Sequence, residues 1–418
     1  MYGMDGADRR DGKHLSKEEE KLCRTATGGE IETALAMNLL STGRTTAWGG
    51  TPLMLAARSN PDAQTIRVLI AAGSDVNHKN VNGNTALMLA ASNNTNVEVI
   101  KALLEAGSKI TERNNNGATP LMYAGNNKNS AVTALLLEAG CDLAARDNDA
   151  MTALMYAALY GAPLKSFQAL FKAGAAIDSV NKYGETVLIL AARGNCSLAV
   201  FELLAGRGAD VNAQNKYGTP VLMHAARNVS DPAVIRFLLA HGAELGYRTK
   251  DGFTALHVAA RNNANPAIAA ALIAAGAGIS EIDNRGRTAL MYAALENKNP
   301  EIIAALVSAG AEVNAGDYHG NTAIMYAALY NHNPEVIRAL VKAGAEVNRG
   351  DLEEVTALIY AVMGNPDPAM ISALLEAGAD ALHRDKYGHR ALDYAEGNRK
   401  LRGSSAYWQL VMRSQEPK

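Results

Sequence analysis

The stretch TALMYAALENKNPEIIAALVSAGAEV, residues 288–313, contains the two recurring phrases of this chain. Its first phrase, TALMYAA, recurs in close variants along the sequence, and its second phrase, SAGAEV, follows the copies at a fixed distance. The hydrophobic residue in the middle of the first phrase recurs at steps of 34 residues, with one step of 33, at Leu53, Leu87, Leu121, Leu154, Leu188, Leu222, Leu256, Leu290, Ile324, Leu358 and Leu392. Self-similarity at such a period indicates a protein built of stacked repeats.

Each copy predicts two helices. The threonine that begins the first phrase can cap a helix through its hydroxyl, and a proline such as Pro334 suits the first turn of the second helix. The glycine of the second phrase, such as Gly242, is placed to end that helix in the left-handed conformation. The apolar positions form a stripe on one side of each helix, for example Val336, Ile337 and Leu340. Since neither helix can bury its stripe alone, neighbouring copies must stack.

Polar segments such as DVNAQNKYGT, residues 210–219, join one copy to the next and predict a turn that projects as a finger. Over roughly residues 16–412 these motifs resemble the ankyrin-repeat family, in a 34-residue variant of a bacterial type. The resemblance implies an all-α solenoid of helix-loop-helix units with short projecting turns and capped ends. Methionine replaces the family's usual histidine in most copies, with His257 as an exception. The extra residue of each copy falls in the loop between the helices, where we expect asparagines to adopt the left-handed conformation.

The ends of the array depart from the pattern, which predicts four regions. Residues 1–15 are expected to form a flexible tail, and residues 16–47 a capping helix pair interrupted at Gly28 and Gly29. Residues 48–385 would form ten repeats, and residues 386–418 a capping repeat and tail in which Trp408 and Val411 share one helix face. Two copies carry Ala150 and Glu354 in place of the turn glycine. Sequence drift explains these two, and a finger distorted for a partner is the alternative.

Composition excludes several classes of function. The 418 residues carry a formal net charge of −2, which argues against a general nucleic-acid or membrane-surface binder. Three cysteines far apart indicate free thiols in a reducing compartment. No secretory signal or membrane span is recognisable, so we expect a cytoplasmic monomer, with a secreted effector as the alternative. No phosphate-binding, metal-ligating or nucleophile motif is present in the sequence, so we expect no enzyme activity, no cofactor and no metal. A pair of groove-facing histidines, His224 and His257, is conceivable, but packing roles are favoured.

The positions that vary between copies indicate a binding function. In ankyrin folds, the resemblance implies, the finger residues and the residues after the paired alanines point to the concave face and contact partners. In the central copies these positions are basic and aromatic, and in the flanking copies they are apolar with tyrosines. The candidate contact residues are Tyr160, Lys182, Tyr183, Arg193, Lys216, Tyr217, Arg227, Arg248, Lys250, Phe253, Arg261, Arg285, Tyr318 and Tyr330. Arginine and tyrosine are enriched among binding hot spots.

These residues predict a protein-binding module whose partner has an acidic or extended segment. A nucleotide or nucleic-acid sensor that uses the same basic and aromatic stripe is the first alternative, because aromatic stacking and phosphate pairing hold single strands. An inhibitor or effector that blocks another enzyme is the second alternative. It would use the same residues of the concave face.

Overall fold

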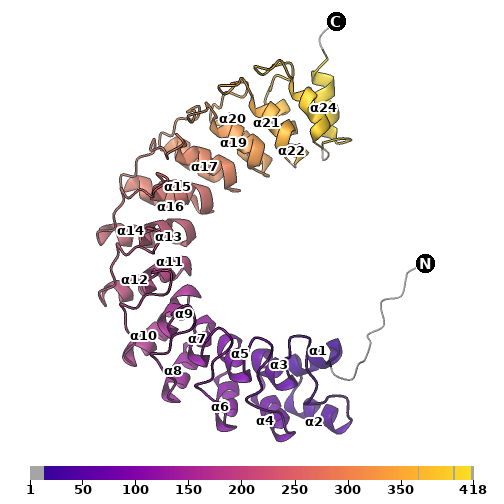
Figure 1. Ribbon diagram of the computed structural model, residues 1–418, viewed down its shortest axis with the longest axis vertical. Helices are drawn as coiled ribbons and strands as arrows, with labels where there is room; N and C mark the ends of the chain where they lie inside the picture. The colour runs from indigo at the N-terminus through magenta and orange to yellow at the C-terminus, as the bar shows by residue number, and fades with distance from the viewer. Residues whose placement is uncertain (1–13, 366, 399–400, 416–418) are drawn as a thin grey trace, which may run out of the picture. The chain divides into compact units, whose positions relative to one another are not determined.

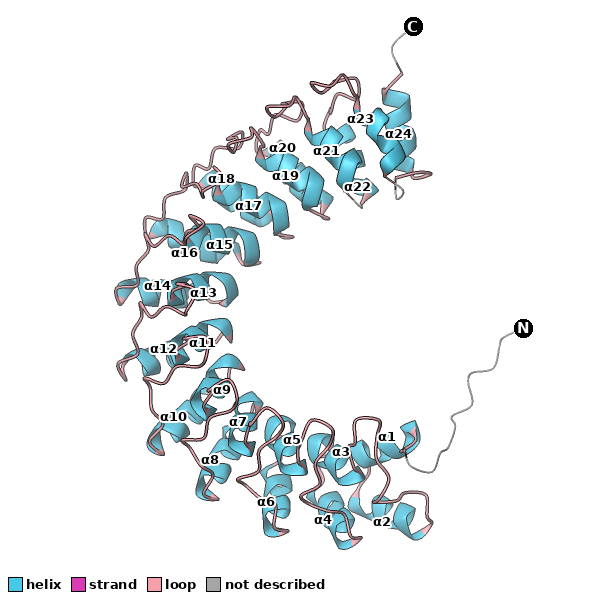
Figure 2. Ribbon diagram, viewed as in Figure 1, coloured by secondary structure: helices cyan, strands magenta, loops and turns pink. Residues whose placement is uncertain are grey.

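The computed structural model describes residues 14–365, 367–398 and 401–415. All regular secondary structure in these residues is helical, and the only strand-like pairings among them are isolated bridges (Figure 2). The chain divides into two compact units between Lys216 and Tyr217. Within each unit, helix pairs follow one another in sequence order (Figure 1). The predicted all-α repeat fold is therefore confirmed.

In the first unit, each pair consists of a first helix and a second helix joined by a short loop. The first helices are α1 (Lys17–Thr25), α3 (Pro52–Ser59), α5 (Ala86–Asn93), α7 (Pro120–Tyr123) continued by η1 (Ala124–Asn126), α9 (Ala153–Leu159) and α11 (Val187–Arg193). The second helices are α2 (Gly28–Ala36), α4 (Ala63–Ala71), α6 (Val97–Glu105), α8 (Ser130–Glu138), α10 (Leu164–Lys172) and α12 (Leu198–Ala205).

The second unit repeats this arrangement. Its first helices are α13 (Val221–Asn228), α15 (Ala255–Asn262), α17 (Ala289–Glu296), α19 (Ala323–Tyr330), α21 (Ala357–Gly364) and α23 (Ala391–Tyr394) continued by η2 (Ala395–Gly397). Its second helices are α14 (Pro232–Ala240), α16 (Pro266–Ala274), α18 (Glu301–Ser308), α20 (Pro334–Lys342), α22 (Pro368–Glu376) and α24 (Ser405–Arg413). Within each unit, first helices contact first helices of the next pair, and second helices contact second helices.

The predicted helix ends are confirmed by the cap geometry. Thr51 accepts a hydrogen bond from the backbone N–H of Met54, and most first helices begin in the same way. Gly242, after the second helix α14, has a φ of 87°, and the glycines at its equivalent positions are also left-handed. Between the caps, Val336, Ile337 and Leu340 are fully buried, as the apolar stripe predicted. Local cap chemistry and stacking of apolar stripes therefore produce each unit.

The loop asparagines behave differently from the expectation. Asn297 is extended, with a φ of −75°, and its Nδ2 donates to the backbone oxygens of Ala260 and Asn263, each at 2.8 Å. Equivalent buried or partly buried side chains bridge to the preceding repeat in the same way at Asn60, Asn94, Asn127, Asn263, Asn331, Asn365 and Asn398. The prediction of left-handed loop asparagines is therefore wrong for this set. Their amides serve as hydrogen-bonding bridges between repeats.

A second loop type follows α9 and α11, and here the left-handed expectation does hold. Asn195 has a φ of 51°, and Gly161 has a φ of 61°. At Gly194 an added Cβ would lie 2.1 Å from the backbone oxygen of Ala158, so the two loops approach too closely for any side chain there. The thiol of Cys196 donates to the same oxygen at 3.3 Å. Close backbone packing thus replaces the asparagine bridge between these two repeats.

The capping pairs differ in detail from the prediction. Ser16 and Glu19 form the expected capping box of α1, but Gly28 and Gly29 open α2 and do not separate the helices. Trp408 on α24 is 59% exposed, and the buried face of that helix is formed by Ala406 and Leu410. Residues 1–13 of the predicted tail lie outside the described residues. The next two residues, 14 and 15, hydrogen bond to the backbone oxygen of Thr45.

Candidate partner-binding surface

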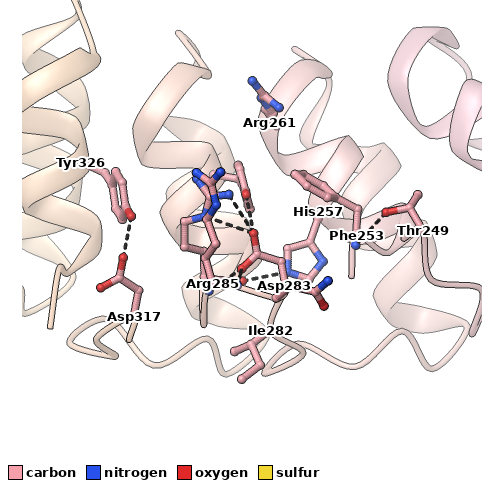
Figure 3. A network of polar contacts seen from close by, with 12 residues as sticks. Thr249, Phe253, His257, Arg261, Ile282, Asp283, Arg285, Asp317 and Tyr326 are labelled. Carbon is pink, nitrogen blue, oxygen red and sulfur yellow. Dashed lines mark hydrogen bonds and ion pairs between the residues drawn. The ribbon is translucent and has the colours of Figure 1, made fainter. Parts of the chain in front are cut away.

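Each finger turn is organised around its first residue. In the finger that begins at Asp283, one carboxylate oxygen accepts the backbone N–H groups of Arg285 and Arg287 at 2.8 and 2.9 Å. The other oxygen accepts the hydroxyl of Tyr292 at 2.6 Å and the guanidinium of Arg287. Figure 3 shows Asp283 at the centre of this network. The finger is therefore tied to the first helix of its own repeat.

The same aspartate–tyrosine bond recurs at a spacing of nine residues. It joins Asp147 to Tyr156, Asp283 to Tyr292, Asp317 to Tyr326, Asp351 to Tyr360 and Asp385 to Tyr394. The Asp385 carboxylate raises the pKa of Tyr394 to about 12. This pair was not predicted, although its signal is visible in the sequence: every finger that begins with aspartate has a tyrosine nine residues later.

Ala150 and Glu354 do not distort their fingers. Both residues adopt the left-handed conformation of the glycine that they replace, with φ of 59° and 60°. The turn hydrogen bonds from Ala150 N to Asp147 O, 2.9 Å, and from Glu354 N to Asp351 O, 3.0 Å, match the corresponding bond of Gly286. The alternative of a finger distorted for a partner is therefore wrong at these positions.

Neighbouring fingers are joined by backbone hydrogen bonds. In the first unit the N–H of Lys182 donates to Asp149 O, and in the second unit the N–H of Asn284 donates to Asp251 O at 3.0 Å. The next finger continues the pattern with Tyr318 N to Arg285 O at 3.2 Å. Equivalent side chains of successive fingers therefore lie side by side within a unit.

In the first unit two of the predicted basic residues have carboxylate partners. Lys182 forms an ion pair with Asp149 of the preceding finger, and Arg193 Nη1 lies 2.5 Å from Glu185 Oε1. The ammonium groups of Lys182 and Lys216 lie 5.1 and 4.7 Å from the ring centroid of Tyr183. A further candidate, Tyr160, is 46% exposed at the end of α9. The basic side chains therefore lie next to exposed aromatic rings, but the carboxylates of Asp149 and Glu185 neutralise part of their positive charge.

The second unit pairs two of its predicted cations as well. Arg248 bonds to Glu281 and to the backbone oxygen of Ile282, and Arg261 bonds to Glu296. The partners are 33 to 35 residues apart, so each ion pair joins neighbouring repeats. Exposed pairs of this kind contribute little to stability.

Three candidate cations of the second unit have no such partner. Arg227, Lys250 and Arg285 are exposed, and their side chains donate no hydrogen bond to any residue that the structure describes. Arg227 and Arg261 occupy the same position of α13 and α15, but only Arg261 pairs with a carboxylate. Arg193 belongs to the first unit.

The predicted aromatic residues of the second unit differ in exposure. Tyr217, Tyr318 and Tyr330 are 67%, 63% and 54% exposed, respectively. Phe253 is half-buried, and its ring lies 4.9 Å from the ring of Tyr292, centroid to centroid. The three tyrosines are therefore more than half exposed, while Phe253 packs partly against Tyr292.

Exposed apolar side chains are concentrated on the fingers and at the ends of the first helices. Of the large hydrophobic residues that the described part of the chain exposes, those between α3 and α24 all lie in or next to a finger or at the end of a first helix, at Val81, Tyr160, Val180, Tyr217, Ile282, Tyr318, Tyr330, Leu352, Met363 and Tyr387. In the same described part of the chain, the second helices from α4 to α22 contribute none. We call the fingers and first-helix ends together the finger surface.

His257 has a packing role. It is 1% exposed, and its ring nitrogens lie 2.8 Å from Thr254 Oγ1 and 3.1 Å from the backbone oxygen of Arg287. Burial lowers the pKa of His257, because a charged imidazole would lose its hydration there. His224 is half-buried on α13.

The described residues contain no group of three or more histidine, cysteine, aspartate or glutamate side chains that could hold a metal ion. Cys23, Cys141 and Cys196 are free and buried, and burial raises the pKa of the Cys141 thiol to about 11. In the same part of the chain, no helix combines the length and the apolar character required to span a bilayer.

Helix pairs in a constant register, joined by finger turns that carry the exposed variable residues, define a helical repeat protein. The family model described as ankyrin repeats, in three copies, matches overlapping windows that together span residues 26–402, so the chain belongs to the ankyrin-repeat family. Proteins of this family generally act as protein–protein interaction modules and are typically not catalytic. A search of curated proteins finds no match.

Proposed function

We propose that the protein is a non-enzymatic binding module that captures a partner protein with an acidic or extended segment along its finger surface. The observation that carries this proposal is the distribution of exposed apolar residues, which favours the fingers and first-helix ends over the second helices. Exposed aromatic residues next to cations are typical of interface hot spots. The buried free thiols support a cytoplasmic location.

The charge arrangement supports a protein partner over nucleic acid. Lys182, Arg193, Arg248 and Arg261 are each paired with a carboxylate of the chain, which leaves few cations to neutralise successive phosphates. A nucleic-acid interface requires several uncompensated cations, and its affinity falls steeply with salt. Tight, salt-sensitive capture of a random-sequence oligonucleotide would contradict the proposal.

The proposal is tested with ligands selected from a display library of peptides and small domains. We expect the triple variant Tyr217→Ser, Tyr318→Ser, Tyr330→Ser to bind them at least roughly thirtyfold more weakly, because one hot-spot residue alone contributes about 2 kcal/mol. The variant should keep its far-ultraviolet circular dichroism, since all three side chains are more than half exposed.

The matched control changes three exposed residues of second helices, Glu138→Gln, Lys172→Gln and Lys342→Gln. This control should bind as the wild type does. If the control lost binding and the tyrosine variant kept it, the finger surface would not be the binding surface.

A further inference from the structure

A pocket of about 300 Å³ lies on the finger surface of the second unit. The finger of Asp251 and Phe253 forms one side, and the next finger forms the other side with Asp283, Asn284, Arg285 and Arg287. Arg261 at the end of α15, with Tyr292 and Leu295 on α17, completes the lining. This volume is at the small end of ligand sites and suits one or two side chains.

The pocket has an aromatic wall. Tyr292 is 1% exposed and lies against Phe253, and the guanidinium of Arg287 lies 4.6 Å from the centroid of the Tyr292 ring. The Tyr292 hydroxyl is held by Asp283. Because Tyr292 is itself covered, a flat side chain of a partner can lie only against the half-buried ring of Phe253, which Tyr292 supports from behind.

The three arginines that line the pocket differ in how many hydrogen bonds they donate within the protein. Arg287 is held along one edge of its guanidinium, since its Nε and Nη2 both donate to Asp283 Oδ2, at 3.1 and 2.9 Å. Arg261 donates through Nη2 to Glu296, but its Nε is buried and has no acceptor among the described residues (Figure 3 shows its place above the network). Arg285 is exposed, and its guanidinium donates to no described residue. Arg285 is therefore the one arginine of the lining that is exposed and whose whole guanidinium donates to no described residue.

The carboxylates of the pocket cannot neutralise Arg285. Asp283 accepts two backbone N–H groups, the Tyr292 hydroxyl and Arg287, so its lone pairs are occupied. Asp251 stands at the exposed rim. Three arginines against these two aspartates give the lining an excess of one positive charge, which Glu296 offsets as long as it is bonded to Arg261. One monoanionic group balances that charge, whereas a dianionic phosphate would be repelled by the neighbouring carboxylates.

We propose that this pocket is the recognition subsite for one aspartate or glutamate side chain of the partner, adjacent in the partner to a flat apolar residue that packs against Phe253. This inference rests on the proposed function and specifies the partner's chemistry at one place. Arg285 is the first pairing group. Glu296 holds Arg261 in the unbound protein, and the incoming carboxylate competes with it for that guanidinium.

The test selects short random peptides on the wild-type protein and measures their dissociation constants by biolayer interferometry. Selected peptides should be enriched in an acidic residue next to an aromatic or aliphatic one. Arg285→Gln should weaken their binding roughly ten- to a hundredfold, as expected for the loss of a charge-assisted hydrogen bond. Glu296→Gln should strengthen binding, because the competing carboxylate is removed. The control Arg236→Gln, on the exposed side of α14, should change it by no more than about twofold.

The outcomes separate the two proposals. A wild-type protein that selects no peptide contradicts the proposed function itself. Peptides that bind Arg285→Gln as tightly as the wild type contradict the pocket proposal and leave the binding module standing. Selected peptides without acidic residues, or displacement by inorganic phosphate at concentrations where acetate has no effect, would overturn the carboxylate assignment. Weakening by Glu296→Gln would overturn the proposed competition.

Discussion

Replacing Asn297 by alanine is the sharpest test of how neighbouring repeats are held together. The side chain is 5% exposed and makes three hydrogen bonds, two from Nδ2 to Ala260 O and Asn263 O and one from the Asn299 N–H to Oδ1. Truncation removes all three and leaves the two carbonyl groups buried without this donor. A net hydrogen bond contributes about 1 kcal/mol and an unsatisfied buried group costs about 1–3 kcal/mol, so we expect a loss of roughly 2–4 kcal/mol.

Because long repeat arrays do not unfold as one unit, the loss should be measured locally. Hydrogen exchange followed by mass spectrometry reports the opening of α15 and α17 separately. A loss of roughly 2–4 kcal/mol corresponds to amide exchange about thirtyfold to a thousandfold faster in these helices if they open together. The control is Asn262→Ala, because Asn262 is exposed on α15. Equal exchange rates in the two variants would refute the bridging role.

Two further predictions concern positions where the repeats differ. The folded state lowers the pKa of His257 below its unfolded value near 6.5, so the unfolded chain binds more protons than the folded chain. The free energy of unfolding should therefore fall as the pH drops below that value. His257→Met, which introduces the residue found in most other repeats, should remove this loss when thermal melts at pH 7.5 and pH 5 are compared. Gly194→Ala should destabilise the protein by roughly 1–3 kcal/mol in urea titration, because the added Cβ would lie 2.1 Å from Ala158 O. The control Gly29→Ala, which places its Cβ in open space within α2, should be neutral or stabilising. Equal midpoints for the two glycine variants, or unchanged pH dependence in His257→Met, would count against these explanations.

The features that the sequence predicted well are local. Threonine caps and left-handed glycines such as Gly242 act within a few residues, so their chemistry can be recognised in any one copy of the repeat. Stacking then follows, because the apolar stripes of Val336 and Ile337 need a partner. Local signals that recur at a constant spacing were therefore sufficient to predict the fold.

The features that were missed depend on contacts between copies. The carboxylate partner of Arg261 is 35 residues away, and which acid reaches which arginine depends on the rotation of one repeat against the next. For the same reason, an asparagine such as Asn331 was interpreted from its own backbone preference, although its amide bridges to the preceding repeat. The candidate site could therefore be predicted as a set of positions, but its net charge could not.

The most direct test of the binding surface is a hydrogen-exchange footprint of the full chain with and without a selected peptide. We predict slower exchange in the fingers at residues 249–254, 283–288 and 317–322 and at the ends of α15, α17 and α19, with no change in α14, α16 and α18. Protection confined to those second helices, with the fingers unchanged, would contradict the account.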